Sequence, residues 1–160
     1  MPTLSMNYAA SAAVTLGLTT TPLGDGNWWQ SAVVDNGTNL YIDATLGGSI
    51  QVGATVVDGG TIDIFLYGDI DGTVYTGGAS GSDAAYTADG EHLLLVDFHT
   101  IVIDATANVD YVWGPRSVRE AFGVMPKKWG VVVQNNTGGA LHGTGSNNTL
   151  DYYGIKYTSA

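Results

Sequence analysis

The chain contains no cysteine and little positive charge. None of its 160 residues is Cys, and only five are Lys or Arg. The absence of cysteine excludes disulfide bonds and thiolate metal sites. The formal net charge of −10 makes the chain a poor non-specific ligand for nucleic acid or for an anionic membrane. We therefore expect neither nucleic acid nor a membrane among its direct partners.

Long apolar runs are also missing. No run approaches the roughly 18 apolar residues of a membrane helix, and no basic residue precedes the mildly apolar stretch at 9–14, as a signal peptide requires. Hydrophobic residues make up 44% of the chain and charged residues only 12%. This composition supports a core and leaves a surface of Thr, Ser, Asn, Gly and Tyr. Such a surface suits contact with other protein, although a Gly/Thr-rich β-protein without partners has the same composition.

Short strand-like runs separated by turn residues fill the chain from residue 13 to its end. In one of them, Ile62, Ile64 and Leu66 alternate with less aliphatic residues, which is typical of a half-buried strand. Gly47-Gly48 is expected to separate two runs, and another run is expected to be interrupted near 97–99. The predicted strands are 13–20, 27–34, 39–44, 49–57, 61–67, 91–104, 110–113, 129–137 and 150–158. The pattern predicts an all-β protein, an antiparallel sandwich or barrel.

Three segments do not follow the strand pattern. Residues 1–12 are small and weakly patterned, and we predict a flexible N-terminal arm that orders only against a partner, followed by one β-sandwich domain at 13–160. Residues 68–90 form a long loop, which is usually functional or mobile. Ser117 fits the N-cap of one short helical turn, with Glu120 at the capping-box position.

No residues carry a catalytic signature. Asp97 and His99 share a face if their strand is regular, but a Ser–His–Asp triad needs a serine from elsewhere in the chain. The two glutamates, Glu91 and Glu120, lack the context of the paired acids of a glycoside hydrolase. We therefore predict a protein that is not an enzyme and needs no cofactor.

Two acidic turns resemble parts of cation sites. Asp69-Ile-Asp71-Gly72 is a fragment of a calcium-loop pattern that lacks its third acidic position and its distal Glu. Asp104 and Asp110 flank a second turn. We expect solvated turns and no metal, with a structural calcium ion as the alternative.

Aromatic and basic residues are the remaining candidates for contact. Adjacent Trp28 and Trp29 must point to opposite faces of a strand, so that one enters the core and the other is exposed or covers an interface. The aromatic residues together suit a core, an interface or a sugar-stacking platform. Four of the five cations form a basic island that suits an acidic partner or a neighbouring copy, or is only solubilising charge on a loop. These cations are Arg116, Arg119, Lys127 and Lys128.

Three segments, at 27–34, 125–137 and 153–158, resemble those of small structural proteins from tailed bacteriophages. The resemblance covers most of the chain from residue 14 onward. Within that group the nearest category is the capsid decoration, or cement, protein. Such proteins commonly form trimers on the head surface of the virion, and some are jelly rolls. The resemblance therefore implies a jelly-roll-like sandwich.

We thus expect a virion protein that stabilises the phage capsid through non-covalent contacts with the major capsid protein. Leu4, Met6 and Tyr8 of the arm are predicted to contact that protein, and Trp28, Trp29 and the basic island are the other predicted contact residues. The alternative is a glycan- or receptor-binding module of a tail or head fibre, whose site uses the 68–90 and 137–149 loops and an exposed Trp. A glycan-active enzyme is the third hypothesis.

Overall fold

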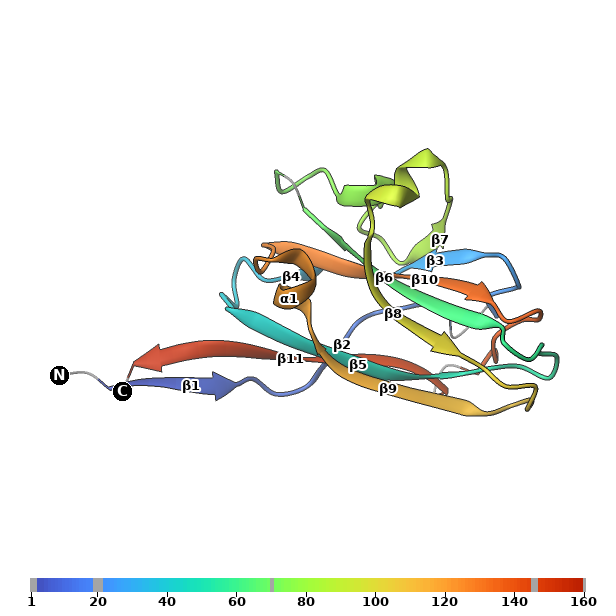
Figure 1. The fold of residues 1–160 in the computed structure, drawn as a ribbon. Helices are drawn as coiled ribbons and strands as arrows, with labels where there is room; N and C mark the ends of the chain where they lie inside the picture. The colour runs from blue at the N-terminus through green and yellow to red at the C-terminus, as the bar shows by residue number, and fades with distance from the viewer. Residues whose placement is uncertain (1–2, 19–21, 70, 145–146, 160) are drawn as a thin grey trace.

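The computed structural model describes residues 3–18, 22–69, 71–144 and 147–159, and these form two antiparallel sheets packed face to face (Figure 1). Sheet 1 has the order β1 (Leu4–Tyr8), β11 (Asn148–Ser159), β5 (Asp43–Gln51) and β9 (Asp110–Ser117), with β2 (Ala12–Ala13) also pairing β11. Sheet 2 has the order β7 (Ala84–Tyr86), β3 (Trp28–Gln30), β10 (Lys128–Asn136), β6 (Thr61–Gly68) and β8 (Val96–Val102), with β4 (Val34–Asp35) also pairing β10.

The strand order is that of a jelly roll. Sheet 1 holds the main strands β1, β5, β9 and β11, and sheet 2 holds β3, β6, β8 and β10. The first main strand pairs with the last, and the second pairs with the next to last, so the chain wraps like a folded-over hairpin into two sheets. This wrapping is the double Greek key of jelly rolls. The predicted all-β, jelly-roll-like sandwich is confirmed.

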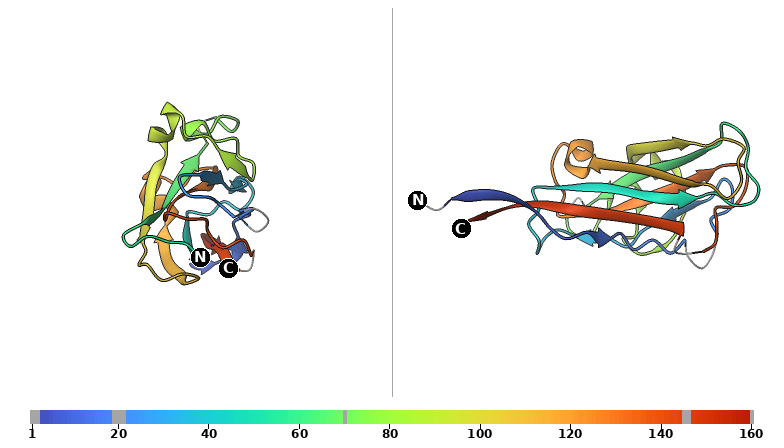
Figure 2. Two further views of the ribbon diagram at one scale, coloured as in Figure 1. Left: turned by 90° about the vertical axis from the view of Figure 1, so that its right-hand side faces the viewer. Right: turned by 90° about the horizontal axis from the view of Figure 1, so that it is seen from below.

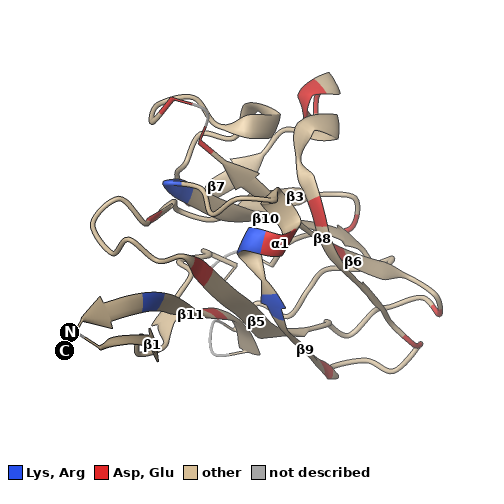
Figure 3. Cartoon of the chain, turned by 60° about the vertical axis from the view of Figure 1, so that its left-hand side comes forward, with Lys and Arg blue, Asp and Glu red and all other residues tan. Residues whose placement is uncertain are grey.

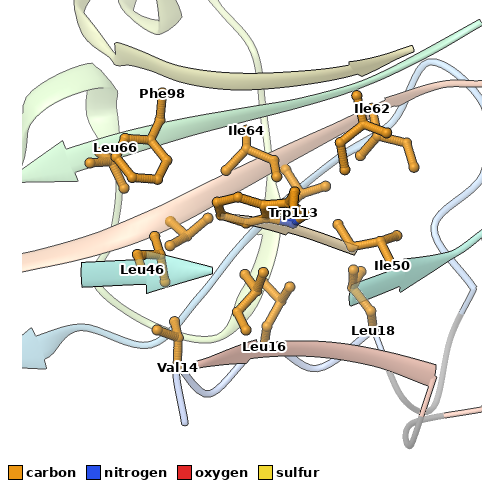
Figure 4. Close-up of a cluster of buried hydrophobic side chains, with 14 of the residues drawn as sticks. Val14, Leu16, Leu18, Leu46, Ile50, Ile62, Ile64, Leu66, Phe98 and Trp113 are labelled. Atoms are coloured by element: carbon orange, nitrogen blue, oxygen red, sulfur yellow. The ribbon is translucent and has the colours of Figure 1, made fainter. Parts of the chain in front are cut away.

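The core lies between the two sheets. The aliphatic row predicted for 61–67, Ile62, Ile64 and Leu66, is buried and points toward Trp113 of β9 (Figure 4). On the other side of Trp113 lie Val14, Leu16 and Leu18, which are buried although, of the described residues of the predicted 13–20 strand, only Ala13 lies in a strand. Period-two apolar patterning therefore directed these side chains inward even where the backbone leaves the sheet.

Two predicted interruptions differ from the structure. The runs 39–44 and 49–57 were expected to be separate, but β5 passes through Gly47-Gly48 as one strand with a bulge against β9. A Cβ at Gly48 would lie 2.2 Å from the Thr149 carbonyl oxygen, so glycine permits close strand approach there and does not end the strand. β8 is also continuous, and its irregularity at 97–99 is a register shift that leaves Phe98 as an extra residue.

The predicted 68–90 loop is largely a packed layer. Residues 71–95, which we call the insert, contain η1 (Thr76–Gly78), β7 and η2 (Gly90–Leu94). Within the insert β7 is the edge strand of sheet 2, and the residues around it cover the outer face of that sheet (Figure 1). The predicted helical turn is confirmed as α1 (Val118–Phe122), where the Ser117 side chain accepts a hydrogen bond from the Glu120 amide and Gly123 ends the turn in a left-handed conformation.

Candidate interaction surface

The N-terminal arm is a strand that projects from the sandwich together with the end of β11. Pairing between β11 and β5 ends at Ile155, and beyond it β11 pairs with β1 alone, from Tyr8↔Ile155 to Leu4↔Ser159. We call residues 4–8 and 155–159 the ribbon, and Figure 2 shows it extending past the body of the molecule. The expected arm is therefore part of sheet 1 and has no separate structure. Its flexibility stays a prediction.

The ribbon has one apolar face and one polar face. Directly paired residues of antiparallel strands share a face, so Met6 and Tyr157 lie on the same side, together with Leu4 and Tyr8. Each of these four side chains, which we call the ridge, is more than half exposed. The opposite face holds Ser5, Asn7 and Thr158, whose side chains are hydrogen-bonded to one another. All three predicted arm contacts, Leu4, Met6 and Tyr8, thus lie on the apolar face.

The outer face of sheet 1 continues this apolar surface onto the body. Tyr153 of β11 is 46% exposed and Val112 of β9 is 81% exposed. Both line a hollow of about 420 Å³ over the stretch of β5 that contains Gly47 and Gly48. A Cβ at Gly47 would lie 2.9 Å from the Trp113 carbonyl oxygen. The neighbouring backbone of β9 therefore leaves no room for a side chain at this part of the hollow.

Val112 was not predicted as a contact residue. Tyr153 and Tyr157 were considered only within the aromatic set that suits a core, an interface or a sugar-stacking platform. The sequence signal that could have found the tyrosines is the period-two row Tyr153, Ile155, Tyr157 within the predicted 150–158 strand. Val112 carries no comparable signal, because its exposure follows from the position of β9 at the edge of sheet 1.

The predicted basic island is not one uniform patch (Figure 3). The Arg116 guanidinium donates a hydrogen bond of 2.7 Å to the Phe98 carbonyl oxygen, and the Lys128 ammonium donates one of 3.1 Å to the Gly72 carbonyl oxygen. Both groups therefore bind their own chain. Arg119 on α1 and Lys127 before β10 are exposed, and they are the members of the island that remain candidates for a partner.

Trp28 and Trp29 point to opposite sides of sheet 2, as predicted, and both are half-buried. Trp29 packs on the main core, and its indole nitrogen donates a 2.7 Å hydrogen bond to Asp83 of the insert. Trp28 packs on the other side, with its ring centroid 5.3 Å from that of Phe65 and 5.8 Å from that of Tyr86. Both indoles line a cavity of about 590 Å³ at the end of β3. The glycan hypothesis expected one exposed Trp, whereas both tryptophans are half-buried and line this cavity.

A second, polar cavity of about 400 Å³ lies where the edges of the two sheets meet. Its lining includes Asp97, Arg116 and Glu120, so the fold brings together two acids that the sequence did not pair. Burial, and secondly the positive charge of Arg116, hold the pKa of nearby His99 below its ordinary value. The Ser117 hydroxyl donates to the Asp43 carboxylate and accepts from the Glu120 amide. Ser117 is thus a capping residue, and the geometry gives it no role as a nucleophile.

In the two acidic turns, aspartate side chains accept hydrogen bonds from the backbone of the same turn. Asp71 accepts hydrogen bonds from the amides of Val74 and Thr73, and these bonds lower the pKa of its carboxyl group. Asp104 accepts bonds from the Thr106 amide and the Tyr111 hydroxyl, which likewise lower its pKa. Across the described part of the chain, no group of three or more His, Cys, Asp or Glu residues is placed to hold a metal ion.

Comparisons with known proteins identify no relative of this chain. No protein family matches the chain, and neither the curated proteins nor the solved structures include a match. Among the described residues, no helix is long and apolar enough to cross a membrane.

Proposed function

We propose that this protein is a structural protein of a phage virion, which decorates the capsid surface and stabilises it through non-covalent contacts with the major capsid protein. The observation that carries the proposal is the ribbon. An isolated two-stranded ribbon is marginal in water, and this one exposes an apolar ridge beyond the core. A monomer that remains free in solution gains nothing from such an element, whereas a protein that is locked into an assembly does.

Apolar burial supplies most of the binding in this proposal. Burying apolar surface contributes about 25 cal/mol per Å², and the ridge offers four large side chains to bury. Exposed ion pairs contribute only about 0–1 kcal/mol each, so Arg119 and Lys127 add orientation more than affinity. Many copies on one lattice multiply the effect of each weak contact. A homotrimer is the expected form, as in the proteins that the sequence resembles.

Co-sedimentation with capsids that lack this protein tests the proposal. The full chain should bind, and a variant without residues 1–8, which loses β1 and keeps β2, should bind at least about tenfold more weakly. A variant with Ser5→Ala and Asn7→Ala keeps β1 and its apolar face, and it should bind like the full chain. Circular dichroism checks that the truncated body is folded. Failure of the full chain to bind capsids contradicts the proposed function.

A glycan-binding module of a tail or head fibre is the second candidate. The observation that favours it is the cavity at the end of β3, which combines Trp28, Trp29 and Tyr86 with the polar side chains of Asn27 and Thr87. Aromatic walls with a few polar groups suit a sugar ring. Tryptophan fluorescence during glycan titration tests this reading. A saturable change that is absent in Trp28→Ala supports it, and no change across a glycan panel contradicts it.

A further inference from the structure

One strand carries both a protruding and a recessed apolar feature on the same face. The ridge is centred on the Met6↔Tyr157 pair, and the hollow lies beside the Gly47↔Asp151 pair. Both Asp151 and Tyr157 belong to β11. Six residues of strand separate them, which is about 20 Å. The molecule therefore presents a convex apolar element and a concave one at a fixed spacing.

Charge identifies a partner that can approach this face. The chain has a formal net charge of −10, so two copies repel each other in most orientations. The strands of sheet 1 carry five charged residues between them, which are Asp43, Asp110, Arg116, Asp151 and Lys156, so the two signs nearly balance on this sheet. The Asp43 carboxylate is also engaged by the Ser117 hydroxyl and the Arg119 amide. Sheet 1 is thus a place where another copy of this acidic chain can dock without strong repulsion.

The exposed apolar area is also sufficient for a pair of copies. Leu4, Met6, Tyr8, Val112, Tyr153 and Tyr157 are between 46% and 81% exposed. At about 200 Å² for each large side chain, these fractions amount to roughly 700 Å². A standard stable interface buries about 800 Å² on each partner. The polar atoms around the hollow and along the ribbon backbone account for the remainder.

We infer that a second copy of this chain covers the face, with the ridge of one copy lying in the hollow of the other. If the contact is reciprocated about a two-fold axis it makes a dimer, and if it is passed around a three-fold axis it makes a trimer. The inference rests on the proposed role in an assembly and assigns the ribbon to contact between copies, so that loss of the ridge weakens capsid binding by dispersing the copies whose combined contacts hold the lattice. The major capsid protein is the competing occupant of the same face.

Charge-pair variants of the ribbon separate its two faces. Met6→Lys with Tyr157→Glu places opposite charges on directly paired residues, which keeps the strands paired while removing the apolar ridge. Ser5→Lys with Thr158→Glu is the matched control, because these residues are also directly paired but lie on the polar face. For the hollow, Val112→Lys is compared with Val102→Lys, which changes a residue of β8 that is also exposed.

Light scattering and sedimentation of the full-length protein, without capsids, give the readout. The unchanged protein and both controls should form a closed oligomer, and the ridge and hollow variants should raise its dissociation constant at least about tenfold. Mixing the ridge variant with the hollow variant should give more association than either variant shows alone, because each mixed pair contains one unaltered ridge-to-hollow contact. One of them keeps an intact hollow and the other keeps an intact ridge.

Three results overturn the inference. One is an unchanged protein that is monomeric up to about 100 μM, well above the concentration at which an interface of this size associates. Another is an oligomer that the hollow variant leaves intact. The third is a mixture of the ridge and hollow variants that associates no more than either variant alone. If the protein is monomeric and the ridge variant still loses capsid binding, the face belongs to the major capsid protein, so the inference fails while the proposed function stands.

Discussion

The two sheets of this jelly roll differ in what covers their outer faces. The outer face of sheet 2 carries Phe65, Tyr67 and Val132, and the insert packs over it to form a second hydrophobic cluster with Tyr86 and Leu95. The outer face of sheet 1 carries Val112 and Tyr153 and continues onto the ribbon. In the described structure it has no such layer (Figures 1 and 2).

The difference shows how one chain treats two similar surfaces. On sheet 2, residues 71–95 bury the aromatic residues of the sheet. Hydrogen bonds from Gln30 to Ser80 and from Trp29 to Asp83 fix this insert to the sheet. On sheet 1 it leaves large apolar side chains in water, where an exposed patch of this kind marks an interaction site. The covered face therefore contributes to folding, and the uncovered face is the one that the proposed function assigns to a partner. Mutations on the two faces should separate these roles.

The largest expected effect comes from the covered face. Tyr67 is fully buried, and its ring lies over Gly130, where a Cβ would come within 2.2 Å of the ring. Tyr67→Ala should lower the free energy of unfolding by about 3–5 kcal/mol, because it leaves a cavity under the insert. Urea denaturation measures this loss. Tyr153→Ala on the uncovered face is the control and should cost less than about 1 kcal/mol, and equal losses for the two variants would remove the distinction between the faces.

The sequence was sufficient to predict the fold class because the core follows period-two patterning. The row through Ile62, Ile64 and Leu66 is buried as alternation requires. Val131, Val132 and Val133 are all buried, because the insert covers the other face of β10. The insert was missed as a packed layer because its apolar residues are spread among glycines. Gly77 and Gly78 adopt positive φ angles that let the chain turn tightly onto sheet 2, and no periodic pattern encodes that path.

The candidate surface was predictable only in part. Leu4, Met6 and Tyr8 were predicted as contact residues of the arm, although their alternation along one strand was not recognised. The partner strand of that segment was not found, because pairing between residues 4–8 and 155–159 is a contact across almost the whole chain length. The basic island appeared as a cluster in sequence. The fold then separated it, since Arg116 and Lys128 reach backbone carbonyl groups in different places.

Alkaline pH should weaken the covered face through the same tyrosine. Burial raises the pKa of Tyr67 to about 12, and its hydroxyl donates to the Ser31 carbonyl oxygen. The unfolded chain loses this proton near pH 10, so the stability is present below pH 10 and is lost as the pH rises toward 12. Tyr67→Phe loses the hydrogen bond, about 1 kcal/mol at neutral pH. Between pH 10 and pH 12 the stability of Tyr67→Phe relative to the unchanged protein should rise by on the order of 2 kcal/mol, so that the deficit becomes an advantage, and a deficit that stays constant contradicts the assignment.

A smaller effect is expected at the link between the insert and the body. The Asp83 carboxylate accepts hydrogen bonds of 2.6 Å from the Gly17 amide and 2.7 Å from the Trp29 indole. Asp83→Ala should cost about 1–2 kcal/mol and should increase amide exchange in the insert. Asp89→Ala makes the same charge change within the insert but removes only a bond to Glu91, so it should leave Gly17 and Trp29 protected. Equal exchange in both variants would mean that Asp83 does not hold the two layers together.

The smallest effect on folding should come from the ribbon, and it should depend on concentration. Tyr157→Ala removes a half-exposed side chain that pairs with Met6, so in dilute solution it should cost less than about 1 kcal/mol. If copies associate through this face, the melting temperature of the unchanged protein rises with concentration, because association stabilises the folded chain by mass action. The variant should show a flat dependence. Differential scanning calorimetry between about 5 and 200 μM spans the range around a micromolar interface. If the melting temperatures of the two proteins changed equally with concentration, sheet 1 would not bind another copy through Tyr157. The two faces would then differ in exposure but not in association with another copy.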